Sequence, residues 1–394
     1  MMRLLVFLVV SGLAHFLAAR WVLSTMSPAA RGRRRRAVVI TAVVLSSLLA
    51  VARLVSTVIE TAASRTLVAV LLLELGAVVI ALVPIGIMTL LARGVSRVVE
   101  RSKPENMVEA EPEVVTRRQA IERVAGATLF GATSSALGWG MVRGRHSFGL
   151  EEVVVRVKNW PRALEGYTIA QVSDIHVGAF VGDRELDEGF ELVTRIRPDL
   201  VVATGDLVDF DSSTVGALAL RLMRAGARDG AYAILGNHDH YAGAGDVAER
   251  LRSMNVNVLS NQSVRLRAGD GGGFALLGVD DYQGRTGRSP GFSGPDLYAA
   301  GRELDAEVPR ILLAHQPKYF EESAGRVALQ LSGHTHGGQI NPGFRPADLV
   351  MEFVAGRYER EGSTLWVNRG FGVAGPPSRV GAPPEVTKIV IVAA

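Results

Sequence analysis

Three long apolar runs occupy the first 91 residues and restrict how this part of the chain can fold. They cover residues 4–23, 37–59 and 66–91. Each has at least the roughly 20 residues that a helix needs to cross a bilayer. A helix also satisfies its own backbone hydrogen bonds in lipid. We therefore predict three transmembrane helices in residues 1–92, with the embedded His15 and Glu74 making contacts between helices.

Basic residues flank these runs unevenly. Arg31 and Arg33–Arg36 lie between the first and second runs, and Arg93, Arg97 and Arg101 follow the third. Because basic loops stay cytoplasmic, the N-terminus is expected outside and residues 92–120 inside. Residues 93–123 are predicted to form a cytoplasmic linker, which is acidic and proline-containing between 104 and 115. Its Arg117-Arg118 pair resembles a twin-arginine export signal.

A fourth, weakly apolar run covers residues 124–142. Its length just suffices to cross a membrane, and an amphipathic helix lying on the membrane is the alternative. If it crosses, it delivers the rest of the chain to the outer face of the cytoplasmic membrane. The predicted protein is thus a multi-pass inner-membrane protein whose C-terminal domain, residues 143–394, lies outside.

Residues 143–394 have the alternating pattern of an α/β domain. Apolar stretches predict strands at 153–157, 167–172, 200–203, 231–235, 311–314, 327–331, 364–367 and 386–392, with further short strands within 256–279. Helical spacing predicts helices at 183–196, 214–225 and 246–254. Strands that first alternate with helices favour a layered domain with helices outside the sheets.

Five polar blocks each follow one of these predicted strands. They are Ser173-Asp174-Ile175-His176, Gly205-Asp206-Leu207-Val208-Asp209, Gly236-Asn237-His238-Asp239, Ala314-His315 and Gly333-His334-Thr335-His336-Gly337-Gly338-Gln339. Strand carboxyl ends in α/β folds converge on one crevice, where ligands collect. The blocks are therefore expected to form one site.

The residue types in these blocks suit a pair of divalent cations. The chain has no cysteine, so any metal site must use His, Asp, Asn or Glu. Two cations about 3.5–4 Å apart neutralise phosphoryl oxygens and turn a bridging water into the attacking hydroxide. Asp206 is the candidate carboxylate that bridges them. His238 is the candidate acid for the departing oxygen, with the adjacent Asp239 orienting its ring.

The ordered set of blocks resembles the calcineurin-like metallophosphoesterase superfamily. The surrounding sequence is similar to its membrane-associated bacterial branch, in Leu164-Glu165-Gly166-Tyr167, in Gly337-Gly338-Gln339 and in Gly381-Ala382-Pro383-Pro384-Glu385. This resemblance implies a four-layer α-β-β-α sandwich of two mixed sheets with flanking helices. It also implies that Asp174, His176 and His336 bind one metal, that Asn237, His315 and His334 bind the other, and that Asp206 bridges.

The expected activity is that of a membrane-anchored phosphoesterase. Manganese, iron or zinc suits the mixed nitrogen and oxygen ligands. A domain held at the bilayer favours a lipid-linked phosphomonoester or phosphodiester, and a UDP-diacylglucosamine-type pyrophosphohydrolase is a specific alternative. Nucleic acid is disfavoured as a partner because residues 151–394 carry 25 basic against 31 acidic side chains. A membrane sensor that binds metal or nucleotide without turnover is the non-enzymatic alternative.

Several polar residues outside the proposed ligand set receive structural interpretations. Asp209 has a helix-start role or supports the site, and His240 is a local structural or rim residue. Asp280 and Asp281 are expected to close a turn, and Arg379 is expected to make a surface salt bridge rather than meet a substrate phosphate. His146 is assigned no role. The oligomeric state is left undetermined.

Overall fold

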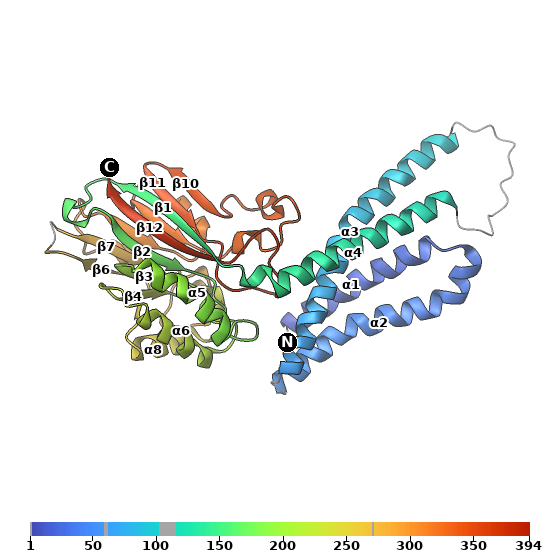
Figure 1. Ribbon diagram of the computed structural model, residues 1–394, viewed down its shortest axis with the longest axis horizontal. Helices are drawn as coiled ribbons and strands as arrows, with labels where there is room; N and C mark the ends of the chain where they lie inside the picture. Colours follow the sequence, from blue (N-terminus) through green and yellow to red (C-terminus); the bar gives the residue numbers. More distant parts are fainter. Residues whose placement is uncertain (1, 59–61, 102–115, 270–271) are drawn as a thin grey trace. The chain divides into compact units, whose positions relative to one another are not determined.

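The structure, a computed structural model, describes residues 2–58, 62–101, 116–269 and 272–394 (Figure 1). The chain divides into two compact units. One comprises residues 1–139 with 375–377, and the other comprises residues 140–374 with 378–394. The predicted acidic linker at 104–115 lies outside the described residues.

The first unit consists of long helices. They are α1 (Met2–Ser24), α2 (Pro28–Val58), α3 (Ala62–Arg101) and α4 (Arg117–Val142). Within the described residues, two stretches are long and apolar enough to cross a membrane, Pro28–Ala52 and Thr66–Leu91, and α1 contributes the shorter apolar stretch Leu8–Ser24. The run at 124–142 is not among these stretches. The paired Arg117 and Arg118 begin α4, and α3 continues to Arg101 into the segment expected as linker.

A polar contact joins two helices of this unit, as the sequence predicts. The Nε2 atom of His15 on α1 lies 3.0 Å from Oε1 of Glu74 on α3. The other ring nitrogen of His15 lies 2.8 Å from the carbonyl oxygen of Ser11. Both ring nitrogens are thus satisfied, and His15 is a helix–helix contact.

Two six-stranded mixed sheets form the second unit. The first has the order β1-β12-β2-β3-β4-β5, with β1 (Gly149–Val157), β12 (Glu385–Ala393), β2 (Tyr167–Val172), β3 (Leu200–Thr204), β4 (Ala231–Ile234) and β5 (Asn257–Val258). The second has the order β10-β11-β9-β8-β7-β6, with β10 (Gly356–Arg360), β11 (Ser363–Val367), β9 (Leu329–Ser332), β8 (Arg310–Leu313), β7 (Phe274–Gly278) and β6 (Gln262–Leu266). Strands β2, β3, β4 and β5 are parallel, as are β7, β8, β9 and β11.

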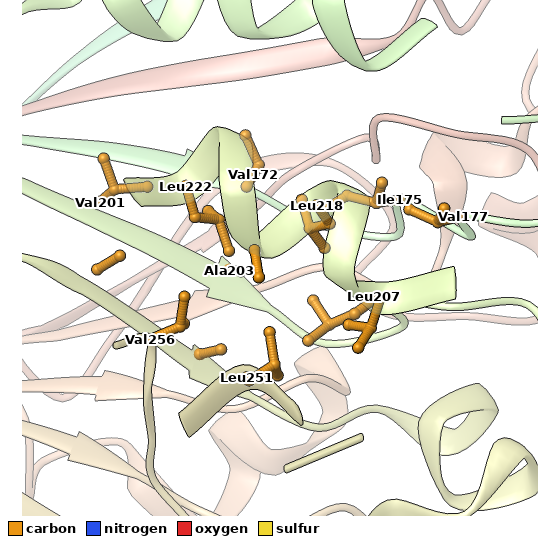
Figure 2. Close-up of a cluster of buried hydrophobic side chains, with 14 of the residues drawn as sticks. Val172, Ile175, Val177, Val201, Ala203, Leu207, Leu218, Leu222, Leu251 and Val256 are labelled. Carbon is orange, nitrogen blue, oxygen red and sulfur yellow. The ribbon is translucent and has the colours of Figure 1, made fainter. Parts of the chain in front are cut away.

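Three helices cover the outer face of the first sheet (Figure 1). They are α5 (Asp183–Ile196), α6 (Val215–Arg224) and α8 (Ala244–Ser253). Leu218 and Leu222 on α6 and Leu251 on α8 pack with Val201 and Ala203 of β3 (Figure 2). Burying these apolar side chains is the main force that holds the helices on the sheet.

A second apolar cluster fills the space between the sheets. It includes Ile169 of β2, Val202 of β3, Leu276 of β7, Ile311 of β8 and Ile389 of β12. The helices outside the second sheet are short, α9 (Leu297–Gly301) and α10 (Phe320–Ser323), and α7 (Asn237–Ala242) follows β4. The predicted layered fold of two mixed sheets with flanking helices is therefore confirmed.

The edge strand β10 is the one strand of the second sheet that the sequence pattern does not predict. Its sequence, Gly-Arg-Tyr-Glu-Arg, is charged, and its burial alternates between half-buried and exposed residues. An edge strand needs little apolar surface, and charged side chains there discourage pairing with other chains. Apolar patterning could not detect it.

Candidate metal centre

The five polar blocks meet where five parallel strands end. Asp174 and His176 follow β2, Asp206 follows β3, and Asn237 and His238 follow β4, all in the first sheet. His315 follows β8, and His334 and His336 follow β9, both in the second sheet. The carboxyl ends of parallel strands in both sheets therefore supply side chains to a single site, as the sequence predicts.

One group of potential ligands contains Asp174, His176 and His336, whose candidate atoms lie within 4.8 Å of one another. The Nε2 atoms of His176 and His336 are 3.1 Å apart, and Nε2 of His336 is 3.6 Å from Oδ1 of Asp174. All three residues are buried. Two neutral imidazole lone pairs this close repel each other unless a cation or a shared proton lies between them.

A second group contains Asp206, His315 and His334. The Nδ1 atom of His334 lies 3.2 Å from Nε2 of His315, which is itself 3.3 Å from Oδ2 of Asp206. The Nδ1 atom of His315 donates to the carbonyl oxygen of Thr204 at 2.8 Å. This hydrogen bond fixes the ring and directs Nε2 into the site.

Asp206, a member of the second group, also faces the first. Its Oδ2 atom is 3.7 Å from Nε2 of His176 in the first group and 3.3 Å from Nε2 of His315 in the second. Its Oδ1 atom accepts a hydrogen bond from the backbone N–H of His238 at 2.8 Å. One carboxylate oxygen thus faces both groups while the other holds the carboxylate in place.

Asn237 gives independent support for a cation site. Its Oδ1 atom is buried and, within the described part of the chain, has no hydrogen-bond partner. An unsatisfied buried carbonyl is unfavourable, but an amide oxygen is a good ligand for a divalent cation. Asn237 neighbours His238, whose N–H contacts Asp206. The donor set of imidazole, carboxylate and amide groups therefore fits two divalent cations.

The backbone at the site is strained. Positive φ angles occur at Asp174 (51°), His176 (52°), Asp206 (51°), His334 (73°) and His336 (51°). Non-glycine residues adopt this left-handed conformation at an energetic cost, and such strain is concentrated at functional sites. Here it turns the chain sharply after each strand, so that side chains from separate loops face one another.

Gly333 allows the closest approach between two of these loops. A Cβ atom at this position would lie 1.9 Å from Oγ of Ser173 and 2.1 Å from Oδ2 of Asp174. The backbone N–H of His334, the next residue, donates to Asp174 at 2.8 Å. Only a hydrogen atom fits between the β2 and β9 loops at this point.

We expect Gly333→Ala to displace Asp174 and to weaken metal binding. Overpacking of this kind costs about 1–3 kcal/mol of folding free energy. Calorimetry of metal binding and a thermal unfolding curve measure the two effects. Gly245→Ala is the matched control, because a Cβ there meets no atom within 4 Å. Unchanged metal affinity in Gly333→Ala would contradict this description of the loop contact.

Burial and charge shift the pKa values of the candidate ligands. Burial lowers the pKa of His176 and of His334 to about 4, and neighbouring histidines add to the effect. Burial, His176 and the Arg379 guanidinium hold the pKa of His336 well below its usual range. Burial alone would raise the pKa of Asp206, but the charge and hydrogen bond of His315 hold it well below its usual range. Neutral imidazoles and an ionised carboxylate are the forms that bind metal. His315 differs: burial alone would lower its pKa, but the charge and hydrogen bond of Asp206 hold it well above its usual range, so His315 must lose a proton when a metal binds.

Asp209, and not Asp239, is the carboxylate beside the His238 ring. The Nδ1 atom of His238 lies 3.0 Å from the carbonyl oxygen of Asp209 and 3.4 Å from its Oδ1 atom. Asp239 instead accepts hydrogen bonds from the backbone N–H groups of Leu207 and Gly236. The prediction that Asp239 orients His238 is therefore wrong. Asp239 thus links the start of α7 to the loop after β3. The short Asp239 side chain reaches the backbone N–H groups at the N-terminus of its own helix more easily than the ring of His238.

The His238 imidazole keeps a raised pKa. Burial alone would lower the pKa, but hydrogen bonding and charge from Asp209, together with the charge of Asp206, raise it above 6.5. The ring lies 4.5 Å, centroid to centroid, from that of His176. An imidazole whose pKa is raised takes up a proton more readily, and beside the candidate ligands it is suited to act as a proton donor.

Two aromatic rings flank His238. The Phe210 ring centroid is 5.1 Å and the Tyr241 centroid 5.4 Å from that of His238. Phe210 is 43% and Tyr241 39% exposed. Neither residue follows from the motif pattern, and the only signal in the sequence is their position directly after Asp209 and His240.

Arg379 does not make the expected surface salt bridge, because it is only 1% exposed. Its Nε donates to the carbonyl oxygen of Gly372 at 2.7 Å, Nη1 donates to that of Arg369 at 2.8 Å, and Nη2 lies 3.1 Å from Nδ1 of His336. Burial lowers its pKa to about 10, so it stays charged at neutral pH. Arg379 therefore holds the 369–382 loop against His336, one of the candidate ligands.

The remaining polar residues have structural partners. His240 is buried, with Nε2 2.9 Å from Asp280 and Nδ1 2.9 Å from the Ser289 hydroxyl. Asp280 also accepts hydrogen bonds from the backbone N–H groups of Ser293 and Gly294. It therefore holds a loop that is longer than the turn expected from the sequence. His146 lies 2.7 Å from Glu188, away from the ligand set.

Comparison with known proteins agrees with this geometry. The family model for calcineurin-like phosphoesterases matches residues 167–338. An uncharacterized metallophosphoesterase from Aquifex aeolicus is 31% identical over 244 residues, 61% of this chain and 91% of that protein. A Danio rerio protein named "Transmembrane protein with metallophosphoesterase domain" is 34% identical over 264 residues, 64% of this chain and 59% of that protein.

The chain spans just over half the length of the first relatives it matches, 59%, 56% and 58%. Among solved structures, TT1561 of Thermus thermophilus is 13% identical to this chain, with a TM-score of 0.37. The match covers 52% of this chain and 90% of TT1561. The similarity to the Aquifex protein covers nearly all of that relative. The chain belongs to the calcineurin-like phosphoesterase family.

Proposed function

We propose that the protein is a membrane-anchored, two-metal phosphoesterase that acts outside the cytoplasmic membrane. The observation that carries this proposal is the position of Asp206 Oδ2, between His176 at 3.7 Å and His315 at 3.3 Å. A carboxylate oxygen shared by two ligand groups supports a pair of cations. When bound, the cations would supply Lewis acidity to the phosphoryl oxygens and lower the pKa of the attacking water.

The residues of the chain perform the other tasks. Asp174, His176 and His336 would hold one cation, Asn237, His315 and His334 would hold the other, and Asp206, which faces both groups, would contribute its carboxylate to both. His238 donates a proton to the departing oxygen, and Asp209 keeps its ring in position. Arg379 and the strained loops keep the ligands fixed before substrate arrives, which lowers the reorganisation needed during the reaction.

A lipid-linked phosphoester is the substrate class that the surroundings of His238 favour. The leaving group must approach His238, and the exposed rings of Phe210 and Tyr241 present apolar surface there. The two apolar helical stretches and the printed name of the Danio rerio relative support a membrane location. An apolar leaving group would gain from both features.

Removing the two rings should therefore affect substrates selectively. We expect Phe210→Ala/Tyr241→Ala to raise KM for an apolar phosphodiester about tenfold or more and to change KM for a small phosphoester far less. Steady-state kinetics on a phospholipid in detergent micelles and on methyl p-nitrophenyl phosphate separate the two cases. Tyr298→Ala removes an 81% exposed ring elsewhere and is the control. Equal losses on both substrates would count against a lipid-linked substrate.

The proposed activity is tested on the full chain in nanodiscs. Metal-loaded protein should hydrolyse bis(p-nitrophenyl) phosphate, lose activity with EDTA and regain it with Mn²⁺, Fe²⁺ or Zn²⁺. His146→Ala, a histidine outside the ligand set, should remain active. Folded, metal-loaded protein without turnover on any phosphoester would instead favour a sensor that binds metal without catalysis.

The topology can be tested by cysteine labelling, because the chain contains no cysteine. We expect a membrane-impermeant maleimide to label Arg184→Cys, 75% exposed in α5, in intact spheroplasts. Arg33→Cys, in the basic segment at the start of α2, should be protected until the membrane is opened. Labelling with the opposite pattern would place the α/β unit on the cytoplasmic face.

A further inference from the structure

The helical unit contains a large cavity that no part of the proposed reaction uses. Its volume is about 1010 Å³, and residues from α1, α2, α3 and α4 line it. Most of the lining is apolar, including Ala42, Leu45, Val78, Leu82 and Phe130. A cavity of this size is at the upper end of those that hold amphiphilic small molecules. None of the lining residues belongs to the metal centre.

Two arginines give this cavity a cationic region. Arg34, near the start of α2, and Arg123, in the second turn of α4, both line it. These helix starts lie near the end of α1, where Nε2 of Gln119 donates to the carbonyl oxygen of Ser24 at 3.4 Å. Within the described residues, no ion pair joins Arg34 or Arg123 to a carboxylate. Their charge is thus available to an anion.

The other charged lining residue does not offset these arginines. Glu74 lies 3.0 Å from His15, and both line the cavity. The carboxylate is thus already engaged with an imidazole. The charge that remains to be matched in the lining is positive.

Trp21, which lines the same cavity, also carries an unsatisfied donor. Its indole nitrogen is buried and has no acceptor among the described residues. The ring packs against Gly126 of α4, where a Cβ atom would lie 2.2 Å from the ring carbons. A buried N–H without an acceptor is unfavourable, and a ligand oxygen would satisfy it.

We propose that this cavity binds one anionic glycerophospholipid of the surrounding bilayer. An acyl chain fills the apolar part, the phosphate lies against Arg34 and Arg123, and a headgroup or ester oxygen accepts the Trp21 N–H. A net anionic lipid matches the guanidinium groups of Arg34 and Arg123, whereas a zwitterionic headgroup brings its own cation to the same place. Because basic segments stay cytoplasmic, the lipid comes from the cytoplasmic leaflet.

Native mass spectrometry of the full chain in mild detergent tests this proposal directly. With phosphatidylglycerol and phosphatidylcholine of identical acyl chains, we expect one tightly retained phosphatidylglycerol, preferred about tenfold or more. Arg34→Gln/Arg123→Gln should abolish that preference. Equal retention of the two lipids by the unmodified chain would overturn the proposal.

The matched control is Arg33→Gln/Arg35→Gln. These neighbours on α2 are exposed and do not line the cavity, and their replacement removes the same charge. We expect this control to keep the preference. If it loses the preference as fully as Arg34→Gln/Arg123→Gln does, general attraction of the basic segment explains binding and the cavity site is wrong.

Trp21→Phe probes the indole N–H while keeping an aromatic ring in the cavity. We expect it to weaken phosphatidylglycerol binding several-fold, and unchanged binding would rule out the assigned hydrogen bond. Displacement of the lipid by equimolar oleate would identify a free fatty acid as the occupant and overturn the glycerophospholipid assignment. All these measurements record lipid binding, so their outcome does not depend on whether the chain hydrolyses phosphoesters.

Discussion

Replacing Asp206 by asparagine is expected to reduce phosphoester hydrolysis more than 100-fold. Replacing a residue that only supports a metal ligand lowers affinity or activity about 10–100-fold. Replacing a carboxylate shared by two cations should lower activity further. Asparagine keeps the size of the side chain and an oxygen that can accept from the His238 N–H. It removes the negative charge that two adjacent cations require. Activity assays and elemental analysis of the purified full chain measure the effect.

Asp211→Asn is the control for this substitution. Asp211 is exposed and accepts the Ser213 N–H at 2.8 Å, so the same chemical change is made outside the ligand set. We expect it to retain metal and activity. Full metal content and full activity in Asp206→Asn would disprove the bridging assignment.

Replacing His238 by alanine is expected to slow hydrolysis in proportion to how poor the leaving group is. Removing a general acid costs about 10²–10⁴-fold when the departing alkoxide needs a proton. The loss should be much smaller for p-nitrophenolate, which leaves without protonation. Metal content should stay unchanged, since the proposed ligands remain in place.

The pH profile gives a second readout of His238. The pKa of this imidazole is raised above 6.5, so the acid form is present below the raised pKa and is lost as the pH rises through it. With a poor leaving group, kcat should fall on the alkaline side in the unmodified chain, and His238→Ala should lack this fall. An unaltered profile, or equal losses for good and poor leaving groups, would remove His238 from the acid role. His146→Ala again serves as the histidine control.

The position of the site could be predicted because it depends on local rules. Each block follows a strand, and strand ends converge in an α/β fold. The expected helix at 183–196 coincides with α5, because its apolar face repeats with helical spacing over four turns. Asp206 faces both groups of candidate ligands, the position expected of the bridging carboxylate that the family resemblance implies.

Contacts between distant loops could not be predicted. Arg379 is 43 residues from His336 in the chain, and only the folded 369–382 loop brings its guanidinium to that ring. Adjacency in sequence favoured Asp239 as the partner of His238, but the helical turn of α7 directs Asp239 to backbone N–H groups. Asp209 reaches the ring from the β3 loop instead.

Electron paramagnetic resonance of the Mn²⁺-loaded full chain tests the central claim most directly. Two Mn²⁺ ions that share Asp206 lie close enough for exchange coupling, so the spectrum should show the many-line pattern of a coupled pair at two equivalents of metal. Asp206→Asn should lose this pattern. A six-line spectrum of isolated Mn²⁺ in the unmodified chain with two equivalents bound would contradict a shared carboxylate.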